Sequence, residues 1–195
     1  MFKQLTPILI ALIIAIAGGI YSADVMTREF AGFGALQYGA WVSHPQTGTQ
    51  DADPYARASA ARTGEIALGS AEGLVFIAAH DDQKQIIVAS CDYVIEGKTP
   101  AARVWSLRIT DKDLLPILTQ SGAVSGLHSG NTLRNGQNAF KVSISSEIAD
   151  GNWIPQMGNG ERRFVLTLYD TSVASTTGVS EIKMPTIKAI GCDNE

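Results

Sequence analysis

The chain begins with one continuous apolar segment and then changes to short stretches in which apolar and polar residues alternate. Residues 7–23 carry no charged side chain, and Lys3 precedes them. A helix that spans a membrane needs about 17–25 apolar residues, so this segment is close to the lower limit of length. The pattern predicts either an uncleaved signal anchor or a cleaved signal peptide.

The position of small residues bears on the choice between anchor and signal peptide. A cleavage site needs small residues on the pattern Ala-x-Ala, and such triplets occur only inside the apolar run. A cut after Ala23 would place Tyr21 where a small residue is required, which favours the anchor over residues 1–26. Lys3 predicts a cytoplasmic N-terminus. Either interpretation exports the rest of the chain. The anchor further predicts, for a bacterial chain, a single-pass protein of the inner membrane with its C-terminal domain in the periplasm.

Four small residues recur at intervals of four within the apolar segment, namely Ala11, Ala15, Gly19 and Ala23. They fall on one face of a helix, where small side chains let a second helix approach closely. The spacing therefore predicts a helix-packing stripe. Signal sequences are also rich in Ala and Gly, so composition alone offers a second explanation.

The body that follows has the period-two alternation of β-strands. In 104–110, Trp105, Leu107 and Ile109 alternate with polar residues. Further strands are predicted at 74–79, 86–94, 141–145, 164–169 and 183–190. The first two of these flank a polar turn at 80–84 and are expected to pair as a β-hairpin.

One short helix is predicted within this body, because Asp53 suits the N-cap position and Pro54 the first helical position. A single helical turn is also expected within 111–121. Together these elements indicate an all-β fold, an antiparallel β-sandwich or partly open barrel with one short helix, preceded by one transmembrane helix. The predicted organisation is an anchor at 1–26, a juxtamembrane connector at 27–50 and a β domain at 51–195.

Composition restricts the class of partner. Hydrophobic residues make up 45% of the chain and charged residues 17%, which argues against a disordered body. The net charge is −4, and Arg162-Arg163 is the only adjacent basic pair. Nucleic-acid binding needs clustered Lys and Arg, so the sequence predicts no nucleic-acid partner.

The two cysteines, Cys91 and Cys192, lie far apart in the sequence, which excludes a local CxxC motif. In an oxidising compartment they are expected to form a disulfide that closes a loop of about 100 residues and stabilises the fold by about 2–4 kcal/mol. In a reducing compartment they would be two small buried thiols.

Candidate catalytic and metal-binding groups are sparse. His44, His80 and His128 are scattered, and no GxSxG pattern is present to supply a nucleophile. His80-Asp81-Asp82 has metal-ligating side chains, but a polar run of this kind also suits a turn. No catalytic residue, cofactor-binding residue or metal ligand is predicted.

Several local patterns, taken in order, resemble the family called domain of unknown function 1214. The patterns are Asp-Pro-Tyr-Ala-Arg-Ala (53–58), Ala-Glu-Gly-Leu (71–74), Cys-Asp-Tyr (91–93), Ala-Arg-Val-Trp-Ser-Leu (102–107), Asn-Trp-Ile-Pro (152–155) and Phe-Val-Leu-Thr-Leu-Tyr-Asp (164–170). The resemblance covers roughly residues 40–192 and is greatest to short, membrane-attached bacterial members, although Tyr169 departs from the pattern. The resemblance implies a β-sandwich-like domain of the bacterial envelope. It also implies a companion, domain of unknown function 1254, which is expected here on a separate partner protein.

The function predicted from these features is non-catalytic binding or scaffolding in a membrane complex. Membrane lipid is expected to contact the N-terminal helix, and the partner is the companion protein or another membrane complex. Two alternatives are an envelope enzyme acting on a small or cell-wall-derived substrate and a carbohydrate-binding module that uses an exposed Trp153. The candidate binding surface comprises Trp153, Arg57 and Glu72, and no cofactor is predicted.

Overall fold

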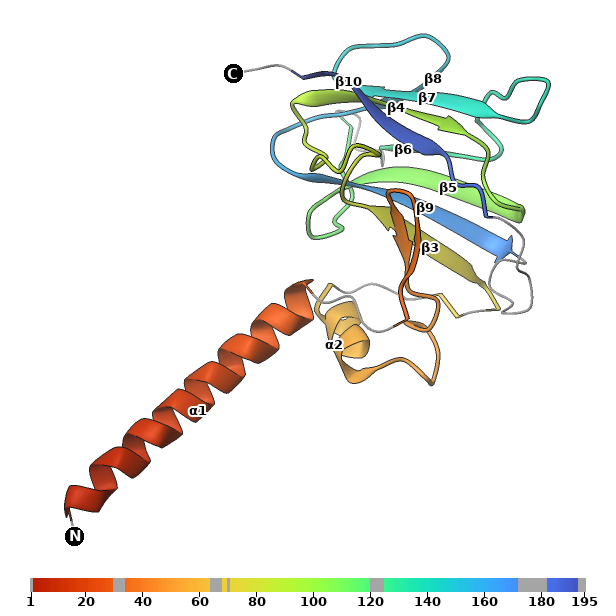
Figure 1. Ribbon diagram of the computed structural model, residues 1–195. Helices are drawn as coiled ribbons and strands as arrows, with labels where there is room; N and C mark the ends of the chain where they lie inside the picture. Colours follow the sequence, from red (N-terminus) through yellow and green to blue (C-terminus); the bar gives the residue numbers. More distant parts are fainter. Residues whose placement is uncertain are drawn as a thin grey trace.

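The computed structural model describes residues 2–29, 34–63, 68–69, 71–119, 125–171 and 182–192. Helix α1 (Phe2–Glu29) projects from a β body, with α2 (Pro54–Thr63) beside its C-terminal end (Figure 1). The stretch Thr6–Met26 is long and apolar enough to cross a membrane, and none of its residues is buried against the body. At 1.5 Å per residue its 21 residues span about 32 Å, close to the 30 Å of a hydrocarbon core.

Two sheets form the body. The six-stranded sheet has the order β1 (Leu36–Tyr38), β2 (Trp41–Ser43), β3 (Gly73–Ala78), β9 (Arg162–Thr171), β5 (Ala102–Asp111), β6 (Gly126–His128). The four-stranded sheet has the order β10 (Thr186–Cys192), β4 (Cys91–Gly97), β7 (Phe140–Ser145), β8 (Asn152–Pro155). Every named pair is antiparallel except β7 with β8. The predicted all-β fold with one short helix after an N-terminal apolar helix is confirmed.

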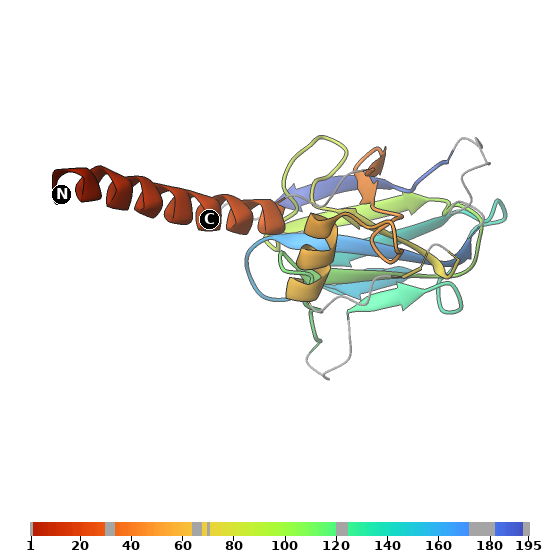
Figure 2. The ribbon, with the colours of Figure 1, turned by 90° about the horizontal axis from the view of Figure 1, so that it is seen from below.

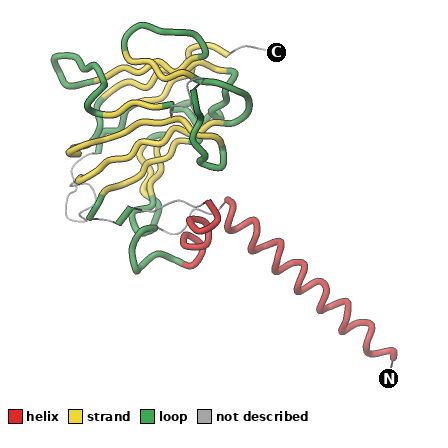
Figure 3. Tube along the Cα trace, turned by 180° about the vertical axis from the view of Figure 1, so that it is seen from behind, coloured by secondary structure: helices red, strands yellow, loops and turns green. Residues whose placement is uncertain are grey.

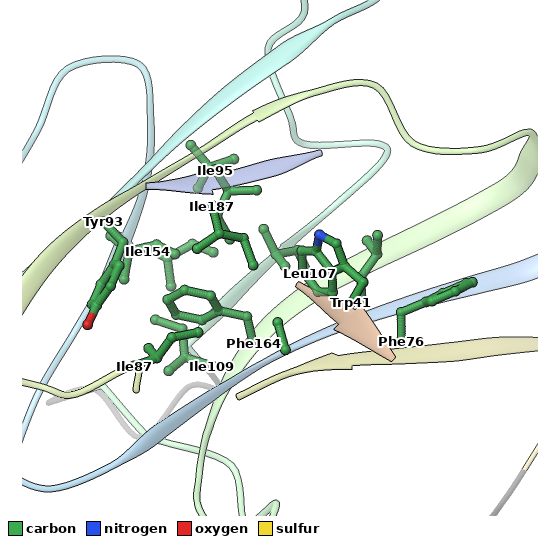
Figure 4. Packing of buried hydrophobic residues seen from close by; sticks show 14 of the residues in the cluster. Trp41, Phe76, Ile87, Tyr93, Ile95, Leu107, Ile109, Ile154, Phe164 and Ile187 are labelled. Atoms are coloured by element: carbon green, nitrogen blue, oxygen red, sulfur yellow. The ribbon is translucent and has the colours of Figure 1, made fainter. Parts of the chain in front are cut away.

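Alternate residues of both sheets meet in one hydrophobic core. The largest fully buried side chains include Trp41, Phe76, Tyr93, Ile95, Leu107, Ile144, Phe164 and Leu166. Figure 4 shows Phe164 among Ile87, Ile109, Ile154 and Ile187. Its ring also meets Tyr93 edge to face, at 5.4 Å between centroids, which joins β9 of one sheet to β4 of the other.

The predicted hairpin between 74–79 and 86–94 is wrong. Strand β3 pairs with β9 over its whole length, whereas β4 begins only at Cys91 and lies in the other sheet. A single bridge between His80 and Ile86 is all that remains of the expected pairing. The physical reason is that the chain crosses from one sheet to the other here, and Ile87 is fully buried between them.

The segment 27–50 is more than the expected connector, because β1 and β2 lie within it and belong to the six-stranded sheet. Trp41 is 1% exposed, and its Nε1–H donates to the carbonyl of Pro185 at 2.7 Å. Trp41 is therefore part of the core, with its indole hydrogen bond satisfied. Since β1 pairs with β2 in the same sheet, the β body starts at Leu36 rather than at residue 51.

The predicted short helix is present as α2. The Asp53 carboxylate accepts hydrogen bonds from the backbone N–H groups of Tyr55 and Ala56, at 2.9 and 3.1 Å. These bonds satisfy donors that a helix start leaves without partners, as the N-cap prediction requires. No helical turn occurs within 111–119, which is the described part of 111–121; Asp111 Oδ1 instead accepts from Asp113 N and Leu115 N and forms a turn.

Candidate functional site

The disulfide expected for an exported chain is present between Cys91 and Cys192. Cys91 is the first residue of β4 and Cys192 the last residue of β10, and the two stand opposite each other in the antiparallel ladder. The bond therefore fastens the edge strand of the four-stranded sheet to its neighbour, across 101 residues of sequence.

A groove of about 730 Å³ lies beside the four-stranded sheet. Its polar lining comes from three strands and two loops: Glu96, Arg134, Lys141, Ser143, Asp150 and Asn152. Asn152 is fixed in place by accepting from Leu133 N at 2.6 Å and donating to the carbonyls of Leu133 and Lys141. The sequence analysis identified none of these residues, because they come together only in the folded sheet.

A surface ion pair flanks this groove. Lys188 Nζ lies 2.7 Å from Glu96 Oε1, and the hydrogen bond from Lys188 lowers the pKa of the Glu96 carboxyl below its ordinary value. Both side chains are largely exposed, so the pair contributes little to stability. Glu96 is therefore a carboxylate at physiological pH and places a negative charge at the groove.

Trp153 lies close to the groove, since it pairs with Ser143 across β7 and β8. Its ring is partly buried, and Nε1–H donates to Ser145 Oγ at 3.1 Å. Arg57 lies on α2 and donates to the carbonyl of Gln50, whereas Glu72 accepts from Gly69 N at 3.0 Å. Helix α2 and strand β8 lie at opposite ends of the body (Figure 1), so Trp153 and Arg57 do not share a surface.

The small-residue stripe of α1 meets the body only at its last member. Ala23 lines a crevice between α1 and α2, together with Ile20, Asp24, Ala58 and Arg62. Ala11, Ala15 and Gly19 are exposed, and a side chain added at Gly19 would meet nothing within 4 Å among the described residues. Packing of this stripe against another helix stays a prediction.

The polar run at 80–82 serves the fold. Asp81 is 3% exposed and its carboxylate accepts from Gln83 N and Gln85 N, which closes the turn. Asp82 Oδ2 accepts from Ile187 N at 2.9 Å, and the Asp82 N–H donates to the Ile187 carbonyl at 3.1 Å. These bonds attach the edge strand β10 to the turn. No group of three or more His, Cys, Asp or Glu side chains suited to a metal is found within the described ranges.

Arg162 is a buried cation that the sequence analysis left unassigned. It is 3% exposed, and its guanidinium donates to the carbonyls of Met157, Asn159 and Glu161 at 2.6 to 3.1 Å. Burial lowers the pKa of Arg162, which Asp111 partly opposes. The sequence could have predicted its burial, because Arg162 lies on the same face of β9 as the buried Phe164 and Leu166.

His44 lines a small pocket of about 60 Å³ with Pro45 and Leu74. Burial lowers the pKa of its imidazole below the ordinary 6.5, and the Asp53 carboxylate partly opposes this shift. Above pH 6.5 the imidazole is neutral in the folded and unfolded states alike and contributes nothing. Below it the unfolded state binds the proton first, so acidification favours unfolding.

We therefore expect the free energy of unfolding of the wild type to fall between about pH 7 and pH 5 more steeply than that of His44→Gln. Denaturant titrations followed by tryptophan fluorescence at several pH values measure both slopes. Equal slopes for the two proteins would contradict the assignment.

Comparison with known proteins places this fold among proteins without an assigned activity. The family described as "Protein of unknown function (DUF1214)" matches residues 72–173. No curated protein matches the chain. The crystal structure of the VPA0106 protein from Vibrio parahaemolyticus is similar with a TM-score of 0.58 and 18% identity, over 90% of this chain and 43% of that chain. An uncharacterized protein from Burkholderia cenocepacia has a TM-score of 0.42 and 14% identity, over 86% of this chain and 38% of that chain.

Proposed function

This chain belongs to the DUF1214 family, and we propose that it is a membrane-anchored envelope protein whose β domain binds a partner in a membrane complex. The observation that carries the proposal is α1. Its Thr6–Met26 stretch is apolar, matches a bilayer in length and has no residue buried by the body. Such a surface is costly in water, and a bilayer or another apolar partner has to cover it.

Two further features support the proposal that the β body lies in the periplasm. Lys3 at the short N-terminal side favours a cytoplasmic N-terminus, which puts the body across the membrane. The Cys91–Cys192 disulfide suits an oxidising compartment such as the bacterial periplasm. We take both together as support for a single-pass protein of the inner membrane.

A binding role is supported by the greater length of a similar chain. The chain spans 43% of the similar Vibrio chain, so the same β fold occurs there beside a larger amount of further protein. The family resemblance implies a companion, domain of unknown function 1254, fused or separate. We propose that a protein carrying that companion, or another membrane complex, is the partner of this chain.

The anchor is tested with the full-length chain in its native membrane. We expect it to stay in the membrane fraction under alkaline carbonate and to keep residues 1–23 by intact mass. Replacing Ile13 and Ile16 together with Lys should release it, because each Lys at a helix centre costs about 2.5–3.5 kcal/mol of insertion. The matched control, Leu at both positions, should remain in the membrane. A wild-type chain that lacks residues 1–23 would contradict the anchor.

The partner is tested by cross-linking in intact cells, followed by purification of the full-length chain and mass spectrometry. We expect one other envelope protein in near-stoichiometric amount, lost when the lysine variant fails to reach the membrane. Recovery of this chain alone, with the disulfide and the anchor intact, would overturn the binding role.

The same cells, treated with protease as spheroplasts, should lose the β body if it lies in the periplasm.

A further inference from the structure

Helix α2 contacts α1 at one defined place. Ile20, Ala23 and Asp24 of α1 face Ala58 and Arg62 of α2 across a crevice, and Arg62 Nη2 lies 2.5 Å from Asp24 Oδ1. Figures 2 and 3 show, from below and from behind, the C-terminal end of α1 next to α2. The β body is therefore held against the last turns of α1 as well as being connected to it by the chain.

The contact lies at the end of the apolar stretch. Ile20 is within Thr6–Met26, two turns from its end, and Asp24 is the first charged residue after the uncharged run. A stretch that fills a hydrocarbon core of about 30 Å ends where the polar headgroup layer begins, and that layer adds about 5–8 Å on each side. The uncharged run ends at Ala23, and the charge of Asp24 places the boundary between hydrocarbon and headgroups near these two residues. A helix that touches Ala23 and Asp24 therefore lies at that boundary, next to the headgroup layer.

The two faces of α2 differ in a way that suits this depth. Ala56 is 5% exposed and faces the body, whereas Tyr55, Arg57, Ala58, Ala61 and Arg62 are exposed on the opposite side. Tyr is enriched at membrane–water boundaries, and Arg places its apolar stem in lipid and its charge near phosphates. One guanidinium N–H of Arg57 donates to the Gln50 carbonyl, and a guanidinium has further donors for a phosphate oxygen.

We infer that α2 is a second membrane contact, lying in the headgroup layer with its exposed face toward phospholipid, and that its contact with α1 fixes the orientation of the β body. This inference rests on the proposed function, since it needs α1 to span the membrane. The four-stranded sheet and its groove then point away from the membrane, at the end of the body farthest from α1 (Figure 1). That surface is the one presented to partners in the periplasm.

The contact of α2 with α1, rather than its net charge, is what we expect to hold α2 in the headgroup layer. Asp51 and Asp53 stand at its N-terminal end and offset Arg57 and Arg62, so the surface has no large positive charge to attract anionic lipid. The Arg62–Asp24 pair matters because an isolated carboxylate near the hydrocarbon boundary is unfavourable, and pairing lowers that cost.

The test uses the full-length chain in phospholipid vesicles, labelled with a fluorophore at one introduced cysteine, without reductant so that the native disulfide stays intact. The positions are Leu12→Cys in the apolar stretch, Ala61→Cys on α2 and Ser146→Cys directly after β7. Nitroxide on the lipid headgroup should quench the label at 61 severalfold more than the label at 146. Nitroxide deep in the acyl chains should quench the label at 12 most.

Equal headgroup quenching at 61 and 146, with strong deep quenching at 12, would overturn this inference and leave the anchor intact. Loss of quenching at 12 as well would overturn the proposed function. Arg62→Glu sets two carboxylates against each other at Asp24 and should reduce quenching at 61 to the level at 146. Arg103→Glu, a charge reversal at an exposed site of β5, should change nothing. Unchanged quenching at 61 in Arg62→Glu would also overturn the inference.

Discussion

Reduction of the Cys91–Cys192 disulfide is expected to lower the free energy of unfolding by about 2–4 kcal/mol. The bond closes a loop of 101 residues, which restricts the unfolded chain strongly. Strand β10 also has few other attachments. Only Ile187 of its residues is buried, and the other contacts include the ladder with β4, the Lys188–Glu96 pair, the bond from Thr186 Oγ1 to the Glu96 carbonyl and the two Asp82 bonds. Without the disulfide, the C-terminal end of β10 should separate from β4 first.

Denaturant unfolding of the full-length chain in detergent micelles, with and without reductant, measures the difference. The matched control is a Cys91→Ala/Cys192→Ala double variant, which should be as unstable as the reduced wild type and insensitive to reductant. Hydrogen exchange should show faster exchange in 189–192 than in β5 after reduction. A change below about 0.5 kcal/mol would mean that the unfolded chain gains little freedom, contrary to the loop-entropy account.

Sequence patterns located several strands correctly, whether one face of the strand is buried, as in β5, or both are, as in the middle of β9. Segments 104–110 and 164–169 became β5 and β9, where Trp105, Leu107 and Ile109 point to the core. Alternation gives the faces of a strand but not its neighbours. The pairing of β3 with β9 joins residues about 90 positions apart in sequence, and no local pattern encodes it. The hairpin prediction failed for this reason.

The same limit explains which parts of the candidate site were predictable. Cys91 and Cys192 were identified because export makes two distant cysteines a natural pair, whatever the topology. The groove was not, since Glu96 lies on β4 and Lys141 and Asn152 on β7 and β8, and the chain between β4 and β7 forms two strands of the other sheet. Trp41 was assigned to a connector because two three-residue strands are too short to show a period.

Arg162 and Arg163 adjoin in the sequence yet should differ sharply when replaced. Arg162→Ala is expected to lower the free energy of unfolding by about 3 kcal/mol, because it removes three hydrogen bonds that a buried, charged donor makes to the 157–161 loop. Arg163 points the other way on β9 and pairs with the exposed Glu161 at 2.9 Å. Its replacement by Ala should cost less than about 1 kcal/mol.

The chemistry of the guanidinium sharpens the comparison. Arg162→Lys keeps the charge but has a single ammonium in place of a planar fork, so it cannot reach the carbonyls of Met157, Asn159 and Glu161 in the same arrangement. We expect it to recover less than half of the loss in Arg162→Ala. Thermal and denaturant unfolding of the three variants beside the wild type measure this order. Equal losses in the free energy of unfolding at 162 and 163 would contradict the role of Arg162. They would show that the backbone holds the 157–161 loop, because removing side-chain bonds that hold a loop should cost more than removing one surface ion pair.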